Sequence, residues 1–104
     1  MSDELVITKE NVDDTRVRFI LQGRVNSLDA NKLQFQLEGA LDSKKKQIVV
    51  NMLQVGYLVS TGIRVLLSAY KKAKQYGGEF YIEHPSENVK NVLGMTALDE
   101  MLLK

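Results

Sequence analysis

A hydroxyl pair and a glycine stand in the middle of the chain, where an apolar run gives way to a helical pattern. The segment reads Tyr57-Leu58-Val59-Ser60-Thr61-Gly62-Ile63-Arg64. The first turn of a helix has free backbone N–H groups and the positive end of the helix dipole, so it favours an anion. A phosphate on Ser60 would be tolerated there without any metal. The segment predicts a serine that can act as a phosphorylation switch, with Thr61 as the second candidate. The alternative is structural, because a serine at a helix start is by itself more often an N-cap than a phosphorylation site.

The elements before this segment predict a hairpin and a helix. Residues 5–8 and 16–21 are rich in β-branched and apolar side chains, with Asn11, Asp13 and Asp14 between them as turn formers. A helix follows, in which Ser27 or Asp29 would be the N-cap. Its apolar residues recur at helical spacing: Ala30, Leu33, Leu37, Ala40 and Leu41.

The elements after it alternate between strand and helix. Residues 48–52 form a short apolar strand, and a helix over 61–76 ends at Gly77-Gly78. That helix has one apolar face: Ile63, Leu66, Leu67, Tyr70 and Ala73. A strand over 80–82 and a helix that starts at Pro85-Ser86 complete the pattern, the helix with Val89, Val92 and Leu93 as its apolar set.

This order predicts a single α/β domain over residues 1–104, with an N-terminal antiparallel hairpin followed by a mostly parallel sheet of about four strands, against which the helices pack. Ligands of such sheets bind beyond the carboxyl ends of the strands. The loops that leave those ends are expected over 23–28 and 53–60, and the second one delivers Ser60.

The chain resembles a STAS domain of the anti-sigma-factor antagonist type. The family has a Gly-acid-x-Asp turn, then a strand followed by Asp-Ser-Ser/Thr-Gly-Leu, a Gly-Gly pair and a late apolar motif. The matching stretches are Gly23-Arg24-Val25-Asn26, Tyr57 to Ile63, Gly77-Gly78, and Val89 to Leu98. The resemblance implies a protein that binds an anti-sigma factor with serine kinase activity and is regulated by phosphorylation of Ser60. It implies that partner contacts come from the two loops: Asn26, Ser27, Val59, Ser60, Thr61 and Gly62.

Two carboxylates of the family pattern are missing. Val59 stands where the family has the aspartate before the serine, and Asn26 stands at the end of the first turn. Carboxylates there would repel a phosphoserine and could help to orient the hydroxyl. Two hypotheses follow: Ser60 is phosphorylated slowly or by an unusual kinase, or the site is vestigial and the partner is bound constitutively.

Two further side chains are candidate partner contacts. Phe35 lies about 170° around its helix from the apolar residues, so it should face water. Arg64 lies one turn after Ser60, on an outer stripe with Ser68, Lys71, Lys72 and Gln75. The alternatives have no functional content. Phe35 would be a single exposed apolar residue, which is common, and the stripe of Arg64 would be a solvated charged face.

Composition argues against several other classes of function. The chain has no cysteine and one histidine, His84, and it lacks a Gly-x-Ser-x-Gly elbow and a phosphate-binding glycine loop. We therefore expect no enzyme, no metal and no cofactor. A net charge of +1 and the absence of a long apolar run predict neither nucleic-acid nor membrane binding, and the acidic start Met1–Glu4 is unlike a signal peptide. A cytoplasmic monomer or weak dimer is expected.

A second class of function remains open. The same domain could serve as an interaction subunit of a transporter or of a stress-signalling scaffold, in which the serine is not modified. The two missing carboxylates favour this alternative.

Overall fold

The computed structural model describes residues 5–103, and these residues form one sheet in which the strand order is β1-β2-β3-β4. β1 (Val6–Asn11) pairs antiparallel with β2 (Arg16–Val25), and β3 (Gln47–Leu58) and β4 (Glu79–Glu83) extend the sheet in parallel. The predicted α/β class, the hairpin and the mostly parallel sheet of four strands are confirmed. The prediction made on Met1–Glu4 lies outside the described residues.

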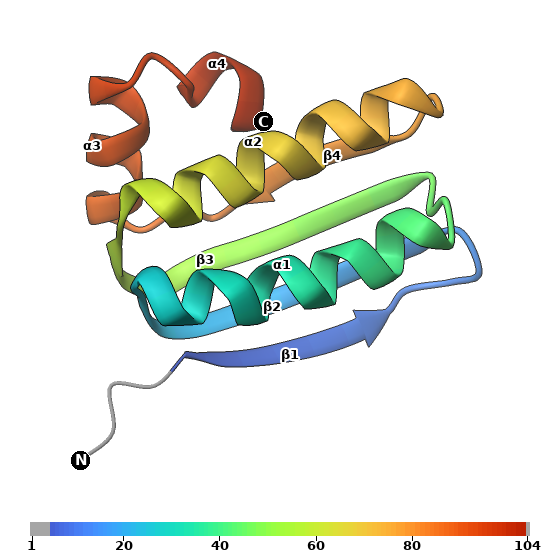
Figure 1. Ribbon diagram of the computed structural model, residues 1–104, viewed down its shortest axis with the longest axis horizontal. Helices are drawn as coiled ribbons and strands as arrows, with labels where there is room; N and C mark the ends of the chain where they lie inside the picture. Colours follow the sequence, from blue (N-terminus) through green and yellow to red (C-terminus); the bar gives the residue numbers. More distant parts are fainter. Residues whose placement is uncertain (1–4, 104) are drawn as a thin grey trace.

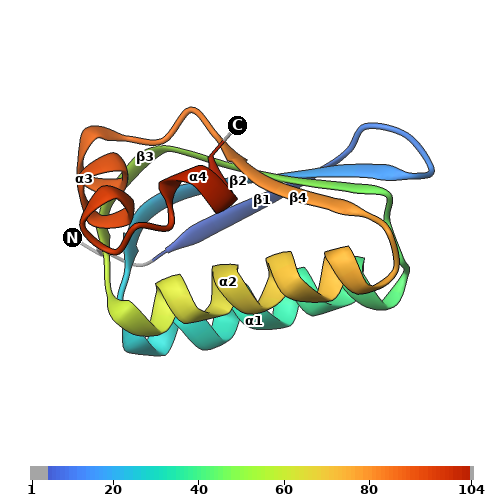
Figure 2. The same cartoon turned by 90° about the horizontal axis from the view of Figure 1, so that it is seen from above.

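The two long helices form one layer on one face of the sheet. α1 (Ser27–Asp42) and α2 (Ser60–Gln75) lie side by side, as Figures 1 and 2 show. α3 (Glu87–Met95) lies at the end of the sheet where both long helices begin, and α4 (Asp99–Leu102) packs beside β4 and α2 (Figure 1). The starts of α1 and α2 therefore lie at the same end of the molecule, next to α3.

The core fills the space between the helix layer and the sheet. All five residues of the apolar face predicted for α1 are buried. The face of α2 is centred differently: its buried residues are Gly62, Leu66, Ala69 and Ala73. Ile63, Leu67 and Tyr70 are half-buried. The prediction followed the large apolar side chains, whereas small residues occupy the centre of the contact and let the helix approach the sheet.

The hairpin turn differs from its prediction. Asn11 is not a turn residue but the last residue of β1, where it pairs with Val17. The turn is organised by the Asp13 carboxylate, which accepts hydrogen bonds from the backbone N–H groups of Thr15 and Arg16. It also forms an ion pair with Arg16, whose Nε donates to Oδ2 at 2.7 Å. These contacts, the Thr15 N–H first, lower the pKa of Asp13 from 3.8 to about 2.

Two predicted loops are strand in the structure. β2 continues to Val25 and β3 to Leu58, and the two strands pair in this part through Gly23 with Val55 and Val25 with Leu58. The register shifts twice here, and Gly23 has a φ of +110°. Glycine is common at such bulges because it tolerates positive φ, so the segment resembles a loop in sequence.

The start of α3 covers an unpaired edge of β3. β4 pairs with β3 only as far as Asn51, which leaves later carbonyl groups without a strand. The Ser86 hydroxyl donates to the Val55 carbonyl at 2.6 Å, and the Asn88 side chain donates to the Gly56 carbonyl at 2.8 Å. Ser86 is also the N-cap of α3, so one side chain begins the helix and closes the sheet edge.

Candidate functional site

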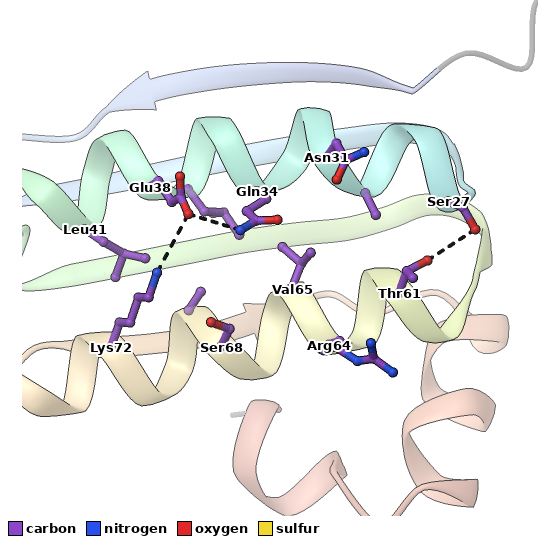
Figure 3. A pocket seen from close by; sticks show the side chains of 13 residues that line it. Ser27, Asn31, Gln34, Glu38, Leu41, Thr61, Arg64, Val65, Ser68 and Lys72 are labelled. Atoms are coloured by element: carbon purple, nitrogen blue, oxygen red, sulfur yellow. Dashed lines mark hydrogen bonds and ion pairs between the residues drawn. The ribbon is translucent and has the colours of Figure 1, made fainter.

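Two helices begin side by side at the carboxyl ends of β2 and β3. The backbone N–H of Val59 donates to the carbonyl of Val25 at 3.0 Å, so the two strand-to-helix junctions touch. Two residues further along each segment, the Thr61 hydroxyl donates to the Ser27 hydroxyl at 3.4 Å, as drawn in Figure 3. The two segments expected to leave the carboxyl ends of the strands are neighbours in the structure, a contact that the sequence does not predict.

The start of α1 is capped by a side chain. Asn26, and not Ser27 or Asp29 as predicted, is the N-cap. Its amide oxygen accepts hydrogen bonds from the N–H groups of Leu28 at 3.1 Å and Asp29 at 3.0 Å. Asp29 adds a negative charge to the first turn. The orphan N–H groups and the dipole of α1 are both compensated from within the chain.

The start of α2 has no such compensation. Its N-cap is Val59, which has no side-chain acceptor, and its first turn contains no acidic residue. The first N–H groups of a helix have no acceptor within it, and a valine supplies none. α2 has 16 residues, and the positive end of its helix dipole lies at these N–H groups.

Ser60 is the first residue of α2, and it is exposed. Its side chain makes no hydrogen bond to any residue between 5 and 103. The alternative interpretation of Ser60 as an N-cap is wrong, because that position belongs to Val59. Thr61, the second candidate, is half-buried and its hydroxyl is engaged with Ser27. Of the two hydroxyls, that of Ser60 is the accessible one.

Gly62 positions the start of α2 and does not form an outer surface. It is buried, and a Cβ atom at this position would come within 2.8 Å of both Leu58 Cδ1 and Val25 Cγ1. The absence of a side chain lets the first turn of α2 pack on the ends of β2 and β3. Its predicted role as a partner contact gives way to a packing role.

The other two predicted contacts lie on the outer surface. Arg64 is exposed one turn after Ser60. Phe35 is 76% exposed, as predicted, but it lies about 12 Å along α1 from the helix start. Sequence reasoning missed Leu28, which is 83% exposed in the first turn of α1. Its spacing of seven residues from Phe35 was the signal, because residues seven apart share a helix face.

Arg24 lies on β2, close to the end of the strand. It pairs with Tyr57 across β2 and β3, and its guanidinium stands over the Tyr57 ring with 4.7 Å to the ring centre. A cation in this position is held by the aromatic face. Two arginines are therefore found near this end of the molecule, Arg24 on β2 and Arg64 on α2, one turn after Ser60.

A groove of about 330 Å³ lies between α1 and α2. It runs along the helices from the Ser27–Thr61 contact to an ion pair between Glu38 and Lys72 at 3.7 Å (Figure 3). Small and apolar residues form its deeper part, among them Ala30, Leu37 and Ala69. The groove is continuous with the helix starts, since Ser27 and Thr61 line both.

Within residues 5–103 no group of three histidine, cysteine, aspartate or glutamate side chains could hold a metal ion. No helix of this part of the chain is long and apolar enough to cross a membrane.

Comparison with known proteins identifies the family of the chain. Residues 6–104 match the model of the STAS domain. The "Putative anti-sigma factor antagonist BtrV" of Bordetella bronchiseptica is 29% identical over 86 residues, which are 83% of this chain and 73% of that protein.

Two solved structures of the antagonist SpoIIAA have the same fold. Its unphosphorylated form superposes with a TM-score of 0.84 and 17% identity, over 94% of this chain and 86% of that chain. Its phosphorylated form, from Bacillus, superposes with a TM-score of 0.77 and 16% identity, over 94% of this chain and 89% of that chain.

Proposed function

The chain belongs to the STAS domain family, and from that premise we propose that it is an anti-sigma-factor antagonist. Its partner is an anti-sigma factor with serine kinase activity. The surface for this partner is the pair of helix starts, with Asn26, Ser27, Val59, Ser60 and Thr61. Phosphorylation of Ser60 by the partner releases the complex.

The observation that carries this proposal is the uncapped start of α2. Ser60 is exposed, makes no hydrogen bond to the described residues and stands beside N–H groups that no side chain caps. A kinase can reach such a hydroxyl without unfolding the helix. The phosphate would add a charge of about −1.5 to −2 at the positive end of a dipole, where it is tolerated. The domain would stay folded, and the added charge would act on the partner.

The relatives support the proposal through their names and their fold. The Bordetella protein is named as an antagonist, and SpoIIAA is described both with and without phosphate. A domain of this fold therefore tolerates the modification. The partner, its kinase activity and the position of the phosphate in this chain are our inference.

The missing carboxylates alter the switch more than the fold. Asn26 accepts two backbone N–H bonds, which an aspartate would accept in the same geometry, so only the charge is lost. Val59 loses both the charge and the cap. With two fewer negative charges near Ser60, a phosphate is repelled less, and we expect slower or weaker release of the partner.

The two missing carboxylates also fit a second function. If the site is vestigial, the chain is a STAS interaction subunit of a transporter or of a stress-signalling scaffold, and Ser60 is not modified. Under either function we expect a cytoplasmic monomer or weak dimer that has no enzymatic activity, cofactor, metal or nucleic acid of its own.

Binding under two nucleotide conditions tests the proposal. The purified chain is mixed with each anti-sigma-type serine kinase encoded in its source genome, first with ADP and then with ATP, and complexes are followed by gel filtration. We expect one kinase to form a complex with ADP and to lose it with ATP. Ser60→Ala should bind equally well and stay bound with ATP. Ser60→Asp should bind at least about tenfold more weakly, because it places a charge in the contact.

Two results would contradict the proposal. A complex that survives ATP in the wild-type chain would favour the constitutive interaction subunit. Release of the Ser60→Ala variant by ATP would place the modified residue elsewhere, with Thr61 as the next candidate.

A further inference from the structure

The groove between α1 and α2 offers a surface beyond the helix starts. Side chains from the two helices bridge it at both ends: Thr61 to Ser27 at 3.4 Å and Lys72 to Glu38 at 3.7 Å (Figure 3). Between the bridges Ser68 stands on the α2 wall, where a larger residue would fill the space. The volume of about 330 Å³ suffices for one or two apolar side chains.

Two exposed apolar side chains stand on the outer face of α1, beside the groove but outside its lining, and we call them the apolar crest. Leu28 and Phe35 are 83% and 76% exposed, and they lie about 20° apart around the helix, two turns from each other. Gly39 follows Phe35 one turn later, and nothing lies within 4 Å of where its Cβ would be. A partner can therefore approach the Phe35 ring from the side as well as from above.

The α2 side has a cationic crest, formed by Arg64, which lines the groove, and by Lys71, which lies outside its lining. Arg64 and Lys71 are both exposed, and neither has an ion-pair partner among residues 5–103. Lys72, in contrast, is tied to Glu38 across the groove. The two crests thus differ in chemistry: one is apolar and the other offers two unpaired positive charges.

We propose that this groove binds an amphipathic helical segment of the partner protein. Its apolar side chains fill the groove and contact Leu28 and Phe35, and its carboxylates face Arg64 and Lys71. The groove spans residues 27–41 of α1, which is about 21 Å, or roughly four turns of a bound helix. Helix-in-groove binding places apolar anchors at this spacing, and the charges of the crest fix the direction of the segment.

The identity of the partner rests on the proposed function. The groove shares Ser27 and Thr61 with the helix starts, so a kinase that reaches Ser60 is placed to lay a segment along it. The segment is a second contact of the same partner, distant from the phosphorylated residue. It would keep the partner bound although the two family carboxylates near Ser60 are missing from this chain.

Substitutions that fill the groove test this inference. Ser68→Trp occupies the space between the helices without touching the core, because Ser68 is exposed. Gln75→Trp is the matched control, since it lies seven residues further on the same exposed stripe and beyond the Glu38–Lys72 bridge. Phe35→Ala removes one anchor from a position that is too exposed to affect folding. Lys71→Glu reverses one charge of the crest, and Lys9→Glu is its control, because Lys9 is exposed on the edge strand β1, away from both helix starts.

Calorimetric titration of the kinase that binds the wild-type chain with ADP gives the readout. We expect Ser68→Trp and Phe35→Ala to raise the Kd at least about tenfold and Lys71→Glu about three- to tenfold, with both controls near wild type. All variants should keep the wild-type melting temperature and should still be phosphorylated on Ser60 at saturating kinase.

The outcomes separate the two proposals. If no kinase binds the wild-type chain, the proposed function fails and this inference fails with it. If a kinase binds and the groove variants bind as tightly as their controls, only the inference is overturned. Self-association in sedimentation velocity that Ser68→Trp abolishes would identify the occupant as a second copy of this chain and would also overturn it.

Discussion

Ser27 and Ser60 occupy equivalent positions, and their surroundings differ in one respect. Each is the first residue of a 16-residue helix, and each follows one of two neighbouring parallel strands. The residue before Ser27 is Asn26, which accepts two backbone N–H bonds, whereas the residue before Ser60 is Val59, which accepts none. The third residue is acidic Asp29 in α1 and buried Gly62 in α2.

At the same structural position, the start of α1 is built for stability and the start of α2 is open for binding. The start of α1 satisfies its own donors and dipole, so it has little to offer an anion. The start of α2 leaves its donors to a ligand, a partner or a covalently added phosphate. One side chain before each serine accounts for most of the difference, and this makes the comparison easy to test.

Packing at the start of α2 should give the largest effect. Gly62→Val would force branched atoms against Val25 and Leu58, where even a Cβ would be at 2.8 Å. We expect a loss of about 1–3 kcal/mol in the free energy of unfolding, measured by urea denaturation. Gly56→Val is the control because nothing lies within 4 Å of its Cβ, and an equal loss there would remove the special role of Gly62.

Removing the cap of α1 should cost nearly as much. Asn26→Ala leaves the N–H groups of Leu28 and Asp29 without their acceptor, so the free energy of unfolding should fall by about 1–2 kcal/mol. Asn26→Asp should retain the stability, because a carboxylate caps in the same way. If Asn26→Ala unfolds at the wild-type urea concentration, the contrast between the two helix starts is not one of capping.

Adding a cap to α2 is the reverse change. Val59→Asp supplies an acceptor and a negative charge to a first turn that has neither, and should raise the free energy of unfolding by about 0.5–1 kcal/mol relative to Val59→Ala. Val59→Ala corrects for the loss of the half-buried valine side chain. A lower melting temperature for Val59→Asp than for Val59→Ala would show that the start of α2 is already satisfied.

A charge on the serines themselves should give the smallest effect. Ser60→Asp places an anion at the uncompensated dipole and should stabilise the chain by about 0.3–1 kcal/mol. Ser27→Asp should gain less, because Asp29 already lies in that turn. Thermal unfolding at low and at 1 M salt would measure both, and the difference should shrink in high salt. Equal gains at the two positions would contradict the comparison.

Periodicity predicted the elements and the core face of α1 because each depends on local spacing. The ends of β2 and β3 could not be predicted, since residues such as Gly23 join the sheet only through pairing with a strand about 30 residues away. The same holds for the edge of β3, which Ser86 and Asn88 close from α3.

The candidate site was predicted in its members and missed in its detail. Ser60 and its neighbours followed from the family pattern, but the N-cap of α1 was placed one to three residues late. Asn, Ser and Asp are similar as caps, so the sequence alone does not choose among Asn26, Ser27 and Asp29. The groove depends on the packing of two helices, which the sequence does not give.

Phosphate mapping on the two equivalent serines shows whether Ser60 alone accepts a phosphate. The chain, Ser60→Ala and Ser27→Ala are each incubated with ATP and the anti-sigma-type kinase that binds the wild-type chain, and intact mass and peptide fragments are recorded. We expect one phosphate on the wild-type chain and on Ser27→Ala, located on Ser60, and none on Ser60→Ala. A phosphate on Ser27, or one that persists in Ser60→Ala, would contradict it.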